Sequence, residues 1–119
     1  MTQNDGKTAL MEAVCDNALD AENLLIASKA DIEAKDDKGM TALMMAACTN
    51  HPEAIQILIN AGANIDSKSV YGRTALMYAC AFNSFDSAKL LVDAGADRNM
   101  KDNRGRTALT FAKEKGFSI

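Results

Sequence analysis

The stretch DKGMTALMMAAC, residues 37 to 48, combines a turn signal with the start of a helix. Gly39 suits the positive φ that a tight turn requires. Thr41 suits the N-cap of a helix, because its hydroxyl accepts a hydrogen bond from an amide of the first helical turn. Closely similar stretches recur at residues 5 to 15, 71 to 80 and 103 to 113. The sequence therefore predicts one turn-and-helix unit that is used repeatedly.

The interval between these stretches is constant. A threonine recurs every 33 residues, at Thr8, Thr41, Thr74 and Thr107. A glycine keeps the same interval, at Gly6, Gly39, Gly72 and Gly105. A fixed period of this length indicates stacked repeats, each of which buries its apolar face against its neighbours.

Each repeat is expected to contain a turn, two short helices and a loop. Pro52 fits the first turn of a second helix, which EAIQILINAG continues. Gly62 is expected to end that helix as its C-cap, as Gly95 does one repeat later. The expected buried side chains of the second helix are Ile55, Ile57, Leu58 and Ile59.

With this order and spacing, the chain resembles the ankyrin-repeat family over nearly its whole length. The family pattern D-x-x-G-x-T-P-L-H-x-A-A, an apolar helix and then G-A-D-x-N matches DDKGMTALMMAA with AGANID, and GRTALMYAC with AGADRN. Alanine stands in the proline column, and methionine or threonine stands in the histidine column. The resemblance implies an all-α ankyrin-repeat solenoid of stacked helix-turn-helix pairs with β-turn loops.

The repeat boundaries are expected near residues 4–36, 37–69, 70–102 and 103–119 of a single domain, 1–119. The last repeat stops before a second helix, which leaves about three full repeats and a half. The first repeat has Lys29 in the glycine column and Glu22 where its second helix should be apolar. We interpret Glu22 as part of the polar outer face of a terminal capping repeat.

Composition and cysteine use favour a cytoplasmic protein. The 119 residues are 48% hydrophobic, no span approaches a membrane helix, and the N-terminal MTQNDGK lacks the features of a secretory signal. The 3 cysteines form an odd set that does not suit a disulfide framework.

No enzymatic, cofactor or metal site is predicted. Helices in contact lie about 8–10 Å apart, whereas zinc holds thiolates at about 2.3 Å, so the repeat-spaced cysteines Cys15, Cys48 and Cys80 are expected to be packing residues. His51 is the single histidine and has no facing carboxylate column. The glycines lie one per turn, which does not form a phosphate-binding loop.

The resemblance implies that partners bind a concave surface made by the turn tips and the exposed face of each first helix. Carried over position by position, this surface is expected to contain Lys38, Met40, Lys68, Val70, Tyr71, Arg73, Phe82, Lys101, Asn103, Arg104 and Arg106. The first repeat would add Asn4, Asp5, Lys7, Cys15 and Asp16.

Charge is distributed unevenly along the chain. Residues 1–60 hold four Lys/Arg against ten Asp/Glu, and residues 61–119 hold nine against six, so their net charges are −6 and +3. Tyr71 and Phe82 add aromatic side chains of the kind that dominates binding hot spots. We therefore predict a non-catalytic protein-binding scaffold, centred on repeats 3 and 4, whose partner carries an acidic patch.

Other interpretations stay open. The basic face of repeats 3 and 4 could bind single-stranded nucleic acid by stacking and charge neutralisation, although the net charge of −3 argues against it. The chain could also be a structural fragment of a longer or engineered ankyrin array. Dimerisation through the truncated C-terminal repeat is a further alternative.

Overall fold

The computed structural model describes residues 7–119, so the predictions for Asn4, Asp5 and Gly6 lie outside the described residues. Seven α-helices and no strand are found in the described part. The helices are α1 Ala9–Cys15, α2 Leu19–Ala27, α3 Ala42–Cys48, α4 Pro52–Asn60, α5 Ala75–Ala81, α6 Phe85–Asp93 and α7 Ala108–Lys115. The predicted all-α class is confirmed.

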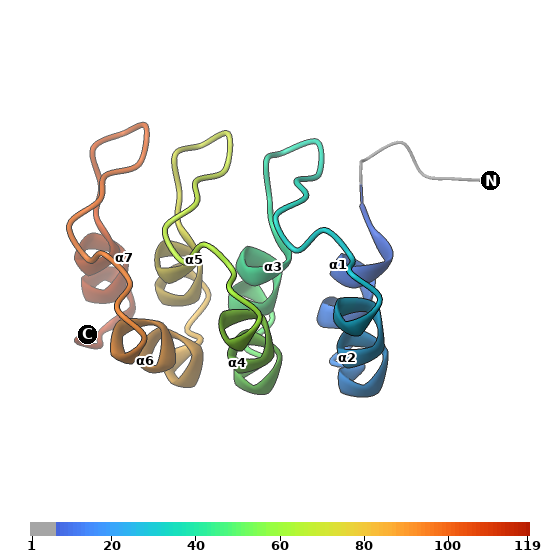
Figure 1. The fold of residues 1–119 in the computed structure, drawn as a ribbon. Coiled ribbons are helices and arrows are strands. Elements are labelled where there is room, and N and C mark those ends of the chain that lie inside the picture. The colour runs from blue at the N-terminus through green and yellow to red at the C-terminus, as the bar shows by residue number, and fades with distance from the viewer. Residues whose placement is uncertain (1–6) are drawn as a thin grey trace.

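The helices stack as successive pairs, α1 with α2, α3 with α4 and α5 with α6, while α7 stands alone at the C-terminal end (Figure 1). The first helices of the pairs form one layer and the second helices form another. The long loops that precede α3, α5 and α7 all project on the same side of these layers. This arrangement sets the turn tips of successive repeats in a row.

The first helices begin as the sequence predicts. Thr41 lies in an extended conformation, and its side chain accepts a hydrogen bond from the amide of Met44 at 3.3 Å. Thr74 caps α5 in the same way through the amide of Met77, at 3.4 Å. Because each cap satisfies an amide that the helix leaves free, these threonines fix where the first helices begin.

The columns of the 33-residue period form the core. The methionines in the histidine column, Met11, Met44 and Met77, are each 1% exposed. The leucine column is buried in the first three repeats, at Leu10, Leu43 and Leu76. Methionine therefore serves as packing in place of a polar side chain, and its flexible thioether suits an interior of small alanines.

The second helix of repeat 2 departs from prediction in two details. Its C-cap is Ala61, and Gly62 is the residue that follows, with its amide hydrogen-bonded to the carbonyl of Ile59 at 3.0 Å. Ile57 is only half-buried, whereas Ala54 is fully buried together with Ile55 and Leu58. The small Ala54 is buried because its position on α4 faces the neighbouring repeat. The hydrophobicity of the residues alone did not indicate this burial.

The prediction of a polar outer face at Glu22 is wrong. Glu22 is fully buried and occupies the column of Ile55 and Ala88, which face the core. Leu24, an apolar residue of the same helix, is instead 68% exposed. Position in the repeat, rather than the polarity of the residue, thus decides which way this side chain points.

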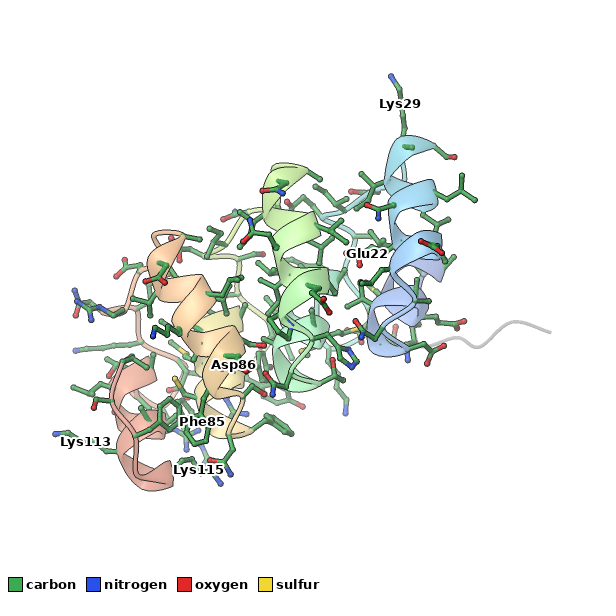
Figure 2. All side chains as sticks on the ribbon, turned by 90° about the horizontal axis from the view of Figure 1, so that it is seen from below. Glu22, Lys29, Phe85, Asp86, Lys113 and Lys115 are labelled. Carbon is green, nitrogen blue, oxygen red and sulfur yellow. The ribbon has the colours of Figure 1, made fainter. Side chains whose placement is uncertain are left out.

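The chain after α7 turns back towards α6. The ring of Phe117 packs edge-on against Phe85, with the ring centroids 4.4 Å apart. The guanidinium of Arg98 donates a hydrogen bond to the carbonyl of Ile119 at 3.2 Å. Phe85 remains 50% exposed at this end of the stack, between α6 and α7 (Figure 2).

Candidate functional site

The turn tips of repeats 2, 3 and 4 are joined by hydrogen bonds. The amide of Val70 donates to the carbonyl of Lys38, and the amide of Asn103 donates to the carbonyl of Tyr71, both at 3.0 Å. The side-chain amide of Asn103 also donates to the carbonyl of Val70 at 2.9 Å. These bonds hold the tips in fixed positions relative to one another, so the tips form one continuous surface.

A side-chain oxygen organises the base of each turn. Asp36 Oδ1 accepts from the amides of Lys38 and Met40, each at 2.9 Å. Ser69 takes this position in repeat 3, and the hydroxyl of Tyr78 donates to its Oγ at 2.8 Å. The turns are thus fixed from below by buried or half-buried groups.

Asp102 holds the same position in repeat 4 and joins two arginines. Arg106 Nε lies 3.1 Å and Arg73 Nε lies 3.6 Å from Asp102 Oδ2. The two guanidinium groups also lie over the ring of Phe111, at 5.6 Å for Arg73 and 4.8 Å for Arg106. The Arg73 guanidinium lies 5.4 Å from the Tyr71 ring as well. Arg73 and Arg106 therefore link repeats 3 and 4.

The electrostatics of Asp102 fit this linking role. Burial raises the pKa of its carboxyl, but hydrogen bonds from the amides of Arg106 and Arg104, together with the Arg106 guanidinium, outweigh that effect. The net result is a pKa below the ordinary value, because the surrounding donors stabilise the ionised form. Asp102 is thus held as a carboxylate.

The outward surface of the tips is apolar at its centre and cationic around it. Val70 is 56% and Tyr71 46% exposed. The exposed cations on the tips and their flanks are Lys35, Lys38, Lys68, Lys101 and Arg104. Within this set, Lys68 Nζ donates to the carbonyl of Lys101 at 3.3 Å.

Two residues of the predicted surface lie apart from this centre. Phe82 is the C-cap of α5, at the opposite end of the helix from the turn that carries Tyr71. At about 1.5 Å per residue, the helix separates its N-cap Thr74 from Phe82 by roughly 12 Å. Met40 is half-buried and packs against the core. The structure therefore does not bring Phe82 next to Tyr71.

Sequence reasoning missed Asp102 and also Phe111, whose ring lies against the arginines that pair with Asp102. The signal for Asp102 was present, because Asp36, Ser69 and Asp102 are spaced by the 33-residue period and each can accept hydrogen bonds within a turn. The signal for Phe111 was weaker. It shares its column with Met45 and Tyr78, both of which are buried.

The cysteines and the histidine occupy packing positions. Among residues 7–119, no group of three or more His, Cys, Asp or Glu residues could hold a metal ion. His51 Nδ1 lies 3.0 Å from the carbonyl of Val14 and 3.0 Å from Thr49 Oγ1, so it bridges repeats 1 and 2. Burial, with a smaller contribution from Cys15, raises the pKa of Cys48 to about 12, and burial raises that of Cys80 to about 11.

Cys80 is expected to react with a disulfide reagent at pH 8 at least about a hundredfold more slowly in the folded protein than in the unfolded chain. Its side chain is fully buried and its thiolate form is disfavoured, and only the thiolate reacts. Stopped-flow labelling of a variant that retains Cys80 alone, with Cys15→Ser and Cys48→Ala, measures this. Labelling at the unfolded rate would contradict the burial of Cys80.

The geometry and the comparisons agree on the class of protein. A family model described as ankyrin repeats, with 3 copies, matches residues 10–102 and 64–118. The chain belongs to the ankyrin-repeat family, whose repeats generally act as protein–protein interaction modules. Among curated proteins, none matches this chain. None of the helices in residues 7–119 has the length and apolar character needed to cross a membrane.

Proposed function

We propose that this protein is a non-catalytic scaffold that binds a protein partner through the turn tips of repeats 3 and 4. The observation that carries the proposal is the exposed pair Val70 and Tyr71 on a row of turns held by inter-repeat hydrogen bonds. Rigid, exposed aromatic side chains lose little conformational freedom on binding, which suits them to hot spots. The three free cysteines fit a reducing, cytoplasmic setting.

The charge around this pair favours a partner with an acidic patch. Lys38, Lys101 and Arg104 are exposed; the Lys38 carbonyl accepts from the amide of Val70, and Arg104 follows Asn103, whose amide donates to the carbonyl of Tyr71. Arg73 and Arg106 belong to the same surface, but their guanidinium groups already pair with Asp102. We therefore assign attraction of the partner to the exposed cations and assign positioning of the Tyr71 ring to Arg73.

Tyr71→Ala is expected to weaken partner binding by at least about 30-fold, which corresponds to about 2 kcal/mol. A pull-down with mass spectrometry identifies the partner, and titration calorimetry then gives the affinity of each variant. Phe82→Ala is expected to cause a similar loss if the partner extends along α5, because Phe82 is 59% exposed at the far end of that helix. Leu24→Ala, at an exposed site in repeat 1, is the matched control.

The results distinguish the alternatives. Unchanged binding by both aromatic variants rejects this surface. Losses at Asp16 or Asp37 instead indicate a basic partner and the acidic half of the chain. Binding only to an oligonucleotide supports the nucleic-acid alternative. Sedimentation velocity at the calorimetry concentrations tests self-association through repeat 4, where Leu109 is 42% exposed.

Lys101→Glu combined with Arg104→Glu is expected to slow association, and to do so most at low ionic strength. Exposed charges steer the encounter of two proteins, and salt screens them. Neither side chain is buried, so the melting temperature should change little. Stopped-flow association rates at two salt concentrations measure the effect, and a salt-independent rate would contradict an acidic partner.

A further inference from the structure

A carboxyl group occupies a core position in the first repeat. Glu22 lies on α2 and is 0% exposed, in the column where Ile55 is 0% and Ala88 is 1% exposed. Figure 2 shows Glu22 on the side of α2 that faces α4. This core position thus holds an aliphatic side chain in repeats 2 and 3 but a carboxylic acid in repeat 1.

Neither oxygen of this carboxyl has a hydrogen-bond partner among residues 7–119. Glu22 Oε1 and Oε2 are both buried without a hydrogen bond. Other titratable groups lie on α1, α2 and α4 or at the caps of these helices. They are Glu12, Cys15, Asp16, Asp20, His51 and Glu53. None of them is hydrogen-bonded or ion-paired to Glu22 in the described part of the chain, and His51 is engaged with Val14 and Thr49. Burial without compensation is the condition that most disfavours a charge.

The first repeat also carries a strained residue where repeats 2 and 3 have glycine. Lys29, just after α2, adopts φ 69°, whereas Gly62 and Gly95 take the equivalent place in repeats 2 and 3. A side chain in this left-handed region is strained, which glycine avoids. Among residues 7–119, α1 and α2 pack against repeat 2 only, and a helix pair stabilised from one side opens more readily than one stabilised from both.

Opening of α1 and α2 would uncover an apolar surface. Ala42, Met45 and Ala54 are buried in repeat 2. Their equivalents in repeat 1 are Ala9, Glu12 and Ala21, which are all exposed among the described residues. The helix pair α1 and α2 is therefore what covers this face of α3 and α4.

We propose that the pair α1 and α2 is a proton-controlled cap, which stays docked on α3 and α4 while Glu22 is protonated and opens when Glu22 ionises. The docked state holds the carboxyl in the core, and the open state returns it to water. Opening thus exposes the apolar face of α3 and α4 as the pH rises.

The direction and size of the change in the opening constant follow from the difference between the pKa values of Glu22 in the docked and open states. Burial raises the pKa of Glu22 from 4.5 to about 7 in the docked state. Docking is therefore fully favoured below pH 4.5 and weakens as the pH rises to about 7, above which it changes no further. The two pKa values correspond to an increase in the opening constant of about 300-fold at most.

Native-state hydrogen exchange of the α2 amides between pH 4.5 and 8, corrected for intrinsic exchange, tests the proposal. In the wild-type protein, the opening constant of residues 22–27 should rise by one to two orders of magnitude or more, towards the limit of about 300-fold. The α5 amides in the middle of the stack should show a much smaller change. Glu22→Gln should abolish the rise in the opening constant, because glutamine keeps the shape of the side chain but cannot ionise.

A control variant, a substitute variant and a direct titration complete the experiment. Glu12→Gln, an exposed acid in the same repeat, should retain the wild-type pH dependence. If Glu22→Gln does not fold, Glu22→Ala, which copies the alanine of Ala88, takes its place. NMR titration of the Glu22 carboxyl gives its pKa directly. A pKa near 4.5, or an equal rise in the opening constant in the Glu22 variants, would overturn the proposal.

Discussion

Asp102→Ala is expected to lower the free energy of unfolding by about 3 kcal/mol, the scale for breaking a buried ion pair. Asp102 Oδ1 accepts from the amides of Arg104 and Arg106, each at 2.9 Å, and Oδ2 faces the Nε atoms of Arg73 and Arg106. Its removal leaves two amides without acceptors and two guanidinium groups without a counter-ion. Urea denaturation at pH 7 measures the loss.

The acid dependence gives this prediction a second readout. The folded-state pKa of Asp102 lies below its ordinary value of 3.8. A carboxyl of this kind stabilises the fold above pH 3.8, and that contribution is lost as the pH falls through the folded-state pKa. The difference in stability between wild type and Asp102→Ala should therefore shrink as the pH falls below 3.8.

Arg104→Ala is the matched control, because its exposed side chain should contribute less than about 0.5 kcal/mol. Asp102→Asn should lie between the two, since an amide oxygen still accepts the backbone hydrogen bonds but carries no charge. If Asp102→Ala were as stable as Arg104→Ala, Asp102 and its two arginines would add no measurable stability to the link between repeats 3 and 4.

The repeat period made most of the fold predictable. A glycine followed two residues later by threonine marks a turn and then an N-cap, and both signals depend on local backbone chemistry. Thr41 and Thr74 accordingly cap α3 and α5. Columns of leucine and alanine predict the core because every interior repeat meets the same two neighbours.

The errors arose where a residue's partners come from another repeat. Glu22 was assigned to the surface from its polarity, but its column faces the core. The role of Asp102 depends on Arg73, which belongs to the preceding repeat, so no local pattern reveals their pairing. A column-by-column comparison of the repeats would have placed Glu22 in the core, since Ile55 stands in the same column.

The binding surface was predictable only in part. The exposure of Val70 and Tyr71 follows from their place beside a turn glycine. The occupation of Arg73 and Arg106 by Asp102 depends on side-chain geometry, which spacing does not give. The separation of Phe82 from Tyr71 could have been anticipated, because a helix lies between them and its length follows from the rise per residue.

Gly72→Ala is expected to lower the free energy of unfolding by about 3 kcal/mol, from strain at φ 76° combined with overlap against the next turn. A Cβ atom at this position would lie 2.9 Å from the amide nitrogen of Asn103 and would overlap its side-chain oxygen. Asn103 would have to move, which breaks its hydrogen bonds to the carbonyls of Tyr71 and Val70.

Gly105→Ala separates these two causes. Gly105 has nearly the same φ, 78°, but no atom lies within 4 Å of a Cβ placed there. Gly105→Ala should therefore lower the free energy of unfolding only by the conformational cost, about 1–2 kcal/mol. Gly39→Ala should resemble Gly72→Ala, because its Cβ would lie 2.9 Å from the amide nitrogen of Val70. Urea denaturation of the three variants compares the losses. Equal losses at all three would mean that contacts between turns add no measurable stability, and would remove the rigid row of tips on which the proposed binding surface depends.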